Sequence, residues 1–138
     1  MSDCCGTEKK CLVYACSGGS NVGQLSNEAA KVLDSSGAGT MSCLAGLGGH
    51  ISGMVASAQS GVPVLVVDGC PIACGKKTFD HLGMKGYGYI EITALGIKKE
   101  HMVNKTPANQ IEEVVTACRK EILRLAGAGP NPGSTCCG

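Results

Sequence analysis

The chain has 138 residues and a formal net charge of +1, with 17% charged and 43% hydrophobic residues. This length suits one domain with an adequate core, and the balanced charge gives no support to a nucleic-acid surface or a polybasic membrane patch. No apolar run approaches the roughly 18 residues of a membrane span. The first residues lack the basic and apolar regions of a signal peptide, which predicts a cytoplasmic protein without membrane contact.

Apolar runs and helical spacing predict alternating strands and helices. Strands are expected at 11–15, 40–44, 62–67 and 87–92. Helices are expected from Ser20 or Asn21, over 51–58, from Pro71, and from Pro107 to Gly127. Segment 45–49 is interpreted as a glycine loop, and 94–102 as a short helical piece or loop. The apolar face of the first helix is expected to hold Leu25, Ala29, Val32 and Leu33.

The order of these elements predicts an α/β fold. It indicates a small doubly wound, Rossmann-like, mostly parallel sheet of about four strands with flanking helices. We expect one domain at 10–127, between flexible tails at 1–9 and 128–138. Each tail carries a Cys-Cys-Gly tripeptide, interpreted either as part of a disordered tail or as mobile thiols that pass metal or electrons to a main site. These thiols are Cys4, Cys5, Cys136 and Cys137.

Cysteine is unusually frequent, with 10 residues in the chain. In a reducing compartment, clustered cysteines more often bind metal or perform redox chemistry than form a disulfide framework. Cys16, Cys43 and Cys70 each follow a predicted strand at intervals of 27 residues. Because the carboxyl ends of parallel strands share one edge, where ligands of such sheets bind, these thiols are expected to converge.

Cys74 lies four residues after Cys70, one turn along the helix that Pro71 is predicted to open, and can face the same point. Four thiolates from three loops suit a tetrahedral zinc site, in which a closed shell makes the ion structural or a cargo. An iron–sulfur cluster or a reversible disulfide on the same cysteines is the alternative. Either form of this alternative would make the protein an electron carrier, a sensor or an oxidoreductase. Whether a reaction is catalysed, and whether a protein partner takes part in redox or metal transfer, stays open.

Three motifs occur in order: YACSGGSNVGQ at 14–24, CLAG at 43–46 and DGCPIACGKK at 68–77. With them the chain resembles the DGC domain family, named for its Asp-Gly-Cys motif, over about residues 12–124. The resemblance implies a zinc-binding domain with four cysteine ligands and names no reaction. The implied ligands are Cys16, Cys43, Cys70 and Cys74.

The remaining candidates are interpreted as structural. Cys118 falls on the apolar stripe of the last helix, and Cys11 opens the first strand, so both are expected in the core. The histidines are interpreted as surface or packing residues. His50 is the nearest alternative metal ligand, whereas His81 lies about 10 Å along the helix from Cys74, too far to share its ion. His101 is interpreted only as a surface or packing residue. Asp68 is expected either to cap a helix or to orient an amide or a water.

Overall fold

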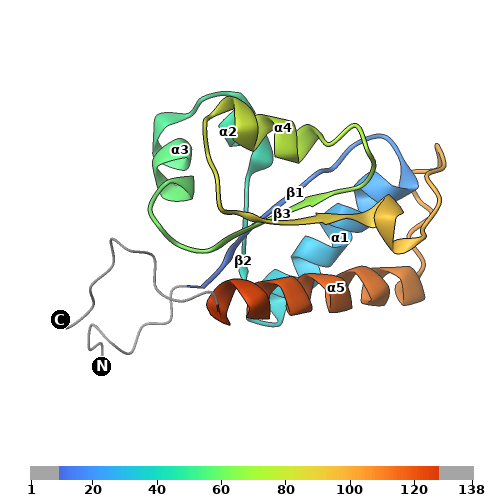
Figure 1. The fold of residues 1–138 in the computed structure, drawn as a ribbon. Coiled ribbons are helices and arrows are strands. Elements are labelled where there is room, and N and C mark those ends of the chain that lie inside the picture. Colours follow the sequence, from blue (N-terminus) through green and yellow to red (C-terminus); the bar gives the residue numbers. More distant parts are fainter. Residues whose placement is uncertain (1–9, 128–138) are drawn as a thin grey trace.

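The computed structural model describes residues 10–127, which form a four-stranded parallel sheet between two layers of helices (Figure 1). The strand order is β2-β1-β3-β4, so the chain reverses direction across the sheet between β1 and β3. This confirms the predicted α/β class and Rossmann-like architecture. The strands are β1 (Leu12–Ala15), β2 (Thr40–Ser42), β3 (Val64–Asp68) and β4 (Gly88–Glu91).

Helices cover both faces of the sheet. Helices α1 and α5 lie side by side on one face, and α2, α3 and α4 cover the other (Figure 1). The helices are α1 (Asn21–Ser35), α2 (Leu44–Gly48), α3 (Ser52–Ala58), α4 (Cys74–His81), the 3-10 helix η1 (Ile92–Leu95) and α5 (Ala108–Gly127).

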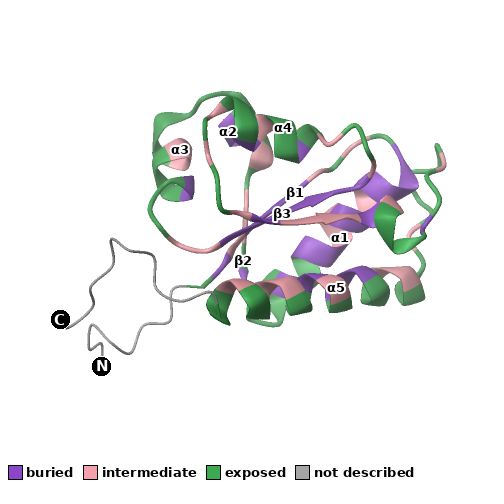
Figure 2. Ribbon diagram, viewed as in Figure 1, coloured by how far each residue is buried: buried purple, intermediate pink, exposed green. Residues whose placement is uncertain are grey.

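The central strands are buried on both faces, as Figure 2 shows for β1 and β3. Side chains alternate along each strand, since neighbouring residues of a strand point to opposite faces. Val13 packs toward α1 and α5, while Tyr14 packs on the other side against Phe79, with ring centroids 5.1 Å apart. Two apolar clusters, one on each face, therefore hold the helices on the sheet.

Three local predictions were wrong. Segment 45–49 is mostly helical, because α2 begins directly after Cys43. Pro71 does not open a helix: it lies in a turn closed by the Ala73 amide on the Cys70 carbonyl, and α4 begins at Cys74. Cys70 and Cys74 therefore do not share a helical turn. Val32 is 37% exposed, since it lies at the rim of the otherwise buried face of α1.

Other predictions at this level agree with the structure. Ser20 caps α1 by accepting a 3.0 Å hydrogen bond from the Gly23 amide. Cys11 and Cys118 are buried in the core, at 5% and 0% exposure. The expected tails at 1–9 and 128–138, with their four cysteines, lie outside the described residues. Between residues 10 and 127, none of the helices has the length and apolar character needed to cross a membrane.

Candidate thiol site

Cysteines follow the carboxyl ends of three neighbouring strands. Cys43 comes directly after β2, Cys16 after β1 and Cys70 two residues after β3. Adjacent strands are spaced by about 4.8 Å, so the backbone brings these three positions to one edge of the sheet. Cys74, the first residue of α4, follows the loop that starts at Cys70. The structure thus places all four predicted cysteines at the edge where the sheet order reverses.

The four thiols differ in their exposure to solvent. Cys16 and Cys70 are partly buried, whereas Cys43 and Cys74 are exposed. All four are free thiols. From residue 10 to residue 127, the structure groups no three histidine, cysteine, aspartate or glutamate side chains closely enough to hold a metal ion. The backbone therefore places the four cysteines at one edge of the sheet, but their sulfur atoms do not surround one common point.

Cys16 occupies the middle of this edge and is fixed by its backbone. Its amide donates a 2.9 Å hydrogen bond to the carbonyl of Val67, and its carbonyl accepts one from the hydroxyl of Ser26. Partial burial raises the pKa of the Cys16 thiol, and the charges of Asp68 and Cys74 raise it further. Backbone amides that donate to its sulfur act in the opposite direction. The Cys16 thiol therefore has a pKa above its ordinary value, chiefly because it is partly buried.

Cys70 has a cation beside its sulfur. The Lys99 ammonium donates a 3.4 Å hydrogen bond to the Cys70 Sγ. A neighbouring positive charge stabilises a thiolate relative to the thiol, and the thiolate is both the nucleophile and the metal ligand. Of the four edge cysteines, Cys70 is the one for which the described residues show such a cation contact.

Asn21 holds the loop that carries Lys99. Its buried side chain donates to the Lys98 carbonyl at 2.9 Å and accepts from the Glu100 amide at 2.6 Å. The backbone N–H of Asn21 also donates to the Glu100 carbonyl at 3.0 Å. These three bonds bracket Lys99 and fix its backbone against the start of α1. Sequence reasoning considered Asn21 only as a cap and missed Lys99, because nothing local links positions 21 and 99.

Asp68 is a helix-capping residue. Asp68 is 1% exposed, and its carboxylate accepts hydrogen bonds from the amides of Gly75 and Lys76 at 2.8 and 2.9 Å. The Tyr89 hydroxyl donates to the same carboxylate at 2.9 Å. Desolvation, followed by the Asp68 charge, raises the pKa of Tyr89, so this hydroxyl keeps its proton. Of the two predicted roles for Asp68, the structure shows the capping role.

Gly69 allows two segments to approach closely. A Cβ at this position would lie 2.6 Å from the Val22 carbonyl carbon and 2.7 Å from the Gly23 nitrogen. Only glycine fits against backbone at such distances. The Asp-Gly-Cys motif therefore has three distinct parts: Asp68 holds α4, Gly69 admits the start of α1, and Cys70 presents a thiol.

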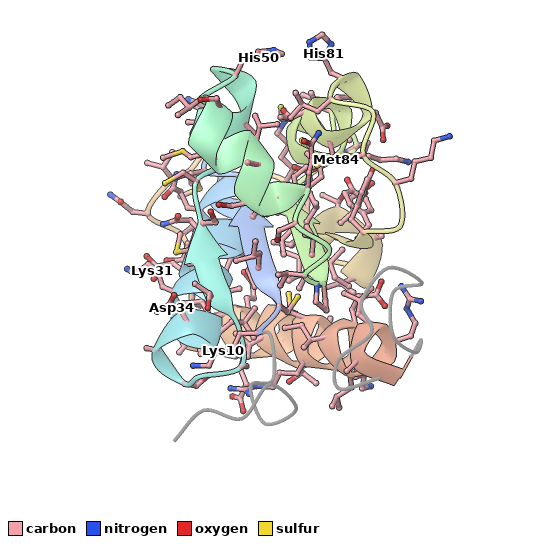
Figure 3. The ribbon with its side chains drawn as sticks, turned by 90° about the vertical axis from the view of Figure 1, so that its left-hand side faces the viewer. Lys10, Lys31, Asp34, His50, His81 and Met84 are labelled. Carbon is pink, nitrogen blue, oxygen red and sulfur yellow. The ribbon has the colours of Figure 1, made fainter. Side chains whose placement is uncertain are left out.

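The histidines lie in two places. The rings of His50 and His81 contact each other, with centroids 5.2 Å apart (Figure 3). The His101 ring lies nearer the loop that follows Cys16, where its Cε1 atom is 3.8 Å from the position of a Cβ on Gly19. The pairing of His50 with His81 was missed, because His50 lies in the turn after α2 and His81 ends α4, and no local pattern links the two positions.

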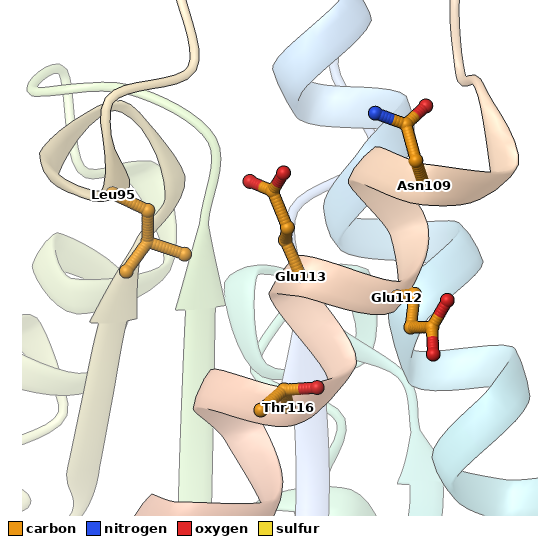
Figure 4. A pocket seen from close by; sticks show the side chains of 5 residues that line it. All are labelled: Leu95, Asn109, Glu112, Glu113 and Thr116. Atoms are coloured by element: carbon orange, nitrogen blue, oxygen red, sulfur yellow. The ribbon is translucent and has the colours of Figure 1, made fainter.

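A shallow hollow elsewhere on the surface lies between η1 and α5 (Figure 4). Its lining contains neither cysteine nor histidine, so it does not belong to the thiol edge. The lining residues are Leu95, Asn109, Glu112, Glu113 and Thr116.

A parallel sheet with cysteines at three neighbouring strand ends, beside a helix capped by a buried carboxylate, defines an α/β protein with a thiol site. The sequence profile of the DGC domain family matches residues 12–118. The chain belongs to the DGC domain family.

One curated relative is the Anaerobic and virulence modulator AnvM of Pseudomonas aeruginosa. It is 42% identical over 90 residues, a match that covers 65% of this chain and 69% of that protein. No solved structure matches the chain significantly.

Proposed function

We propose that the chain binds one zinc ion through the thiolates of Cys16, Cys43, Cys70 and Cys74. The observation that carries this proposal is the position of the first three at the ends of neighbouring strands, with Cys74 at the start of the next helix. Thiolates are preferred ligands of zinc. The donor set therefore fits a soft ion in its chemistry and its location.

Side-chain rotation would complete the ligand set. Cys43 and Cys74 are exposed, so their side chains can change rotamer without repacking the core. The Lys99 ammonium contacts the Cys70 sulfur, and Asp68 fixes the helix that carries Cys74. Four thiolates leave no open position on zinc, so the ion would be structural or a cargo.

The test is the metal content of five serine variants after anaerobic purification. We expect bound zinc in the wild type and in the matched control Cys11→Ser, whose thiol lies in the core. Replacing any of the four edge cysteines replaces a soft thiolate with a protonated hydroxyl, so zinc should be lost or held much more weakly. Equal retention in all five variants, or a wild type without metal, would overturn the proposal.

The contact between Lys99 and Cys70 favours a second candidate, thiol–disulfide redox chemistry. The Cys70 thiolate would attack a partner disulfide and release one partner thiolate. A second edge cysteine would then displace the other partner thiolate and close a protein disulfide. Two protein thiols are thereby oxidised, two protons leave, and the partner disulfide receives two electrons. The word "anaerobic" in the name of AnvM accords with such a redox-related role.

Absorption and thiol counting distinguish the candidates. Zinc thiolate is colourless, whereas an iron–sulfur cluster absorbs visible light. A reversible disulfide gives neither metal nor colour, but two fewer titratable thiols after treatment with glutathione disulfide. The zinc proposal expects stoichiometric zinc, no visible band, and thiols that become titratable when a chelator removes the ion.

A further inference from the structure

Two histidines that are distant in the sequence meet on the surface outside the thiol edge. His50 follows the end of α2, and His81 is the last residue of α4. Their ring centroids are 5.2 Å apart and their planes are nearly perpendicular, at 89°. Both side chains are exposed, and Figure 3 shows them together at the end of the molecule remote from α5.

The backbone of His50 takes an unusual conformation at this point. Its φ angle is +55°, in the left-handed region that residues with a Cβ adopt rarely. A 3.1 Å hydrogen bond from the His50 amide to the Leu47 carbonyl helps to hold the turn. The turn at the end of α2 therefore has a defined backbone at His50, and in the structure the His50 ring contacts the ring of His81 at the end of α4.

The separation of the rings matches that of two imidazoles on one metal ion. With Zn–N bonds of about 2.0–2.1 Å and a tetrahedral angle between them, two bound rings have their centroids about 5 Å apart. We propose that His50 and His81 form a second, thiol-free site for a divalent transition-metal ion such as Zn²⁺. Two protein ligands leave the remaining positions to water or to an exchangeable ligand, so binding here is weaker and more reversible than in a closed thiolate shell.

This site is separate from the thiol edge. His81 is seven residues beyond Cys74, about 10 Å along a helix that rises 1.5 Å per residue. One ion therefore cannot bind both the Cys74 thiolate and the His81 ring. The His50–His81 site would stand even if the thiol edge held no metal, because it uses none of the same ligands.

The test is a titration of the full chain with zinc chloride after iodoacetamide has blocked the accessible thiols. Long-range ¹H–¹⁵N spectra of the imidazoles report each histidine separately. We expect the ring nitrogens of His50 and His81 to shift together and to saturate at one equivalent, while those of His101 stay unchanged.

Single-site variants separate chelation from binding to individual histidines. His81→Gln and His50→Asn should each weaken zinc binding roughly tenfold or more, because each removes one of two coordination bonds. Asparagine is chosen at position 50 because it tolerates a positive φ. The matched control, His101→Gln, should bind as the wild type, and circular dichroism checks that each variant is folded. Unchanged affinity in either single variant, or equal shifts at all three histidines, would overturn the proposal.

Discussion

The carboxylate of Asp68 accepts a 2.8 Å hydrogen bond from the amide of Gly75, and a Cβ on residue 75 would lie 2.8 Å from the same oxygen. The approach is close enough that the carboxylate and a side chain at position 75 exclude each other. The two residues form one structural unit that fixes the first turn of α4, and with it Cys74, against the sheet. Asp68 therefore stabilises the helix that carries Cys74, and both of its carboxylate oxygens accept hydrogen bonds within the fold.

Replacing Asp68 with asparagine should destabilise the fold. The amide of the new side chain cannot accept all the hydrogen bonds that the carboxylate accepts, and a buried donor is left unsatisfied. We expect a loss of about 1–3 kcal/mol in the free energy of unfolding, measured with urea. The exposed carboxylate of Glu112 offers a matched control, since Glu112→Gln should change stability little. Equal effects of the two substitutions would contradict the capping role.

Lys99→Gln should make Cys70 less reactive. The substitution removes the ammonium that contacts the Cys70 sulfur, so the rate of Cys70 alkylation by iodoacetamide at neutral pH should fall by roughly threefold or more. Peptide mass spectrometry can follow Cys70 separately from the other cysteines. Lys98→Gln is the control, because the hydrogen bond between Lys98 and Asn21 uses the backbone carbonyl of Lys98, which the substitution keeps. A Cys70 rate that is unaffected by Lys99→Gln, or lowered equally by Lys98→Gln, would argue against activation by Lys99.

Cys118→Ser should lower stability without affecting metal content. Its side chain is fully buried in the cluster between the sheet, α1 and α5, where the serine hydroxyl would be surrounded by apolar side chains. The expected cost is about 1–3 kcal/mol, measured by denaturant unfolding. Loss of zinc from a folded Cys118→Ser protein would identify Cys118 as a ligand and contradict its place in the core.

The two core thiols should make the protein sensitive to alkali. Burial raises the pKa of Cys11 to about 11 and that of Cys118 to about 12, from an ordinary value of 9.0. The folded state therefore holds these protons more tightly than the unfolded state. Their contribution is fully present below pH 9.0 and is lost as the pH rises through 11 and 12.

Urea unfolding between pH 8 and pH 12 tests this dependence. Cys118→Ala should flatten the decline, because alanine has no proton to release. Tyr87 contributes to the same range, since burial and the hydrogen bond to Asp80 raise its pKa to about 12. Tyr87→Phe, which removes that second titration, serves as the comparison. An alkaline decline as steep in Cys118→Ala as in the wild type would rule out the core thiol as a cause.

Deleting residues 1–8 and 130–138 should leave folding and zinc content unchanged. The deletion removes four cysteines but none of the helices or strands described between residues 10 and 127. Circular dichroism and metal analysis of the shortened protein provide the measurement. A shortened chain that is folded but free of metal would show that the terminal cysteines supply ligands.

Local patterns determined the elements and their order. Apolar runs such as 62–67 report burial on both faces of a sheet, and the helical spacing around Cys118 reports a buried stripe, so both features are visible in the sequence. The three motifs sufficed to indicate the family and the cysteines at the strand ends. The failure at Pro71 has a local cause: a turn, closed by the Ala73 amide on the Cys70 carbonyl, delays α4 until Cys74.

Only the tertiary structure decided which distant groups meet. The sheet order places Cys43, Cys16 and Cys70 side by side, yet the exposure of each thiol depends on how loops pack over the edge. The contact of Lys99 with Cys70 depends on the hydrogen bonds from Asn21 to Lys98 and Glu100. His50 meets His81 because α2 packs beside α4. Such contacts join positions tens of residues apart, whereas periodicity records only which face of its own element a residue occupies.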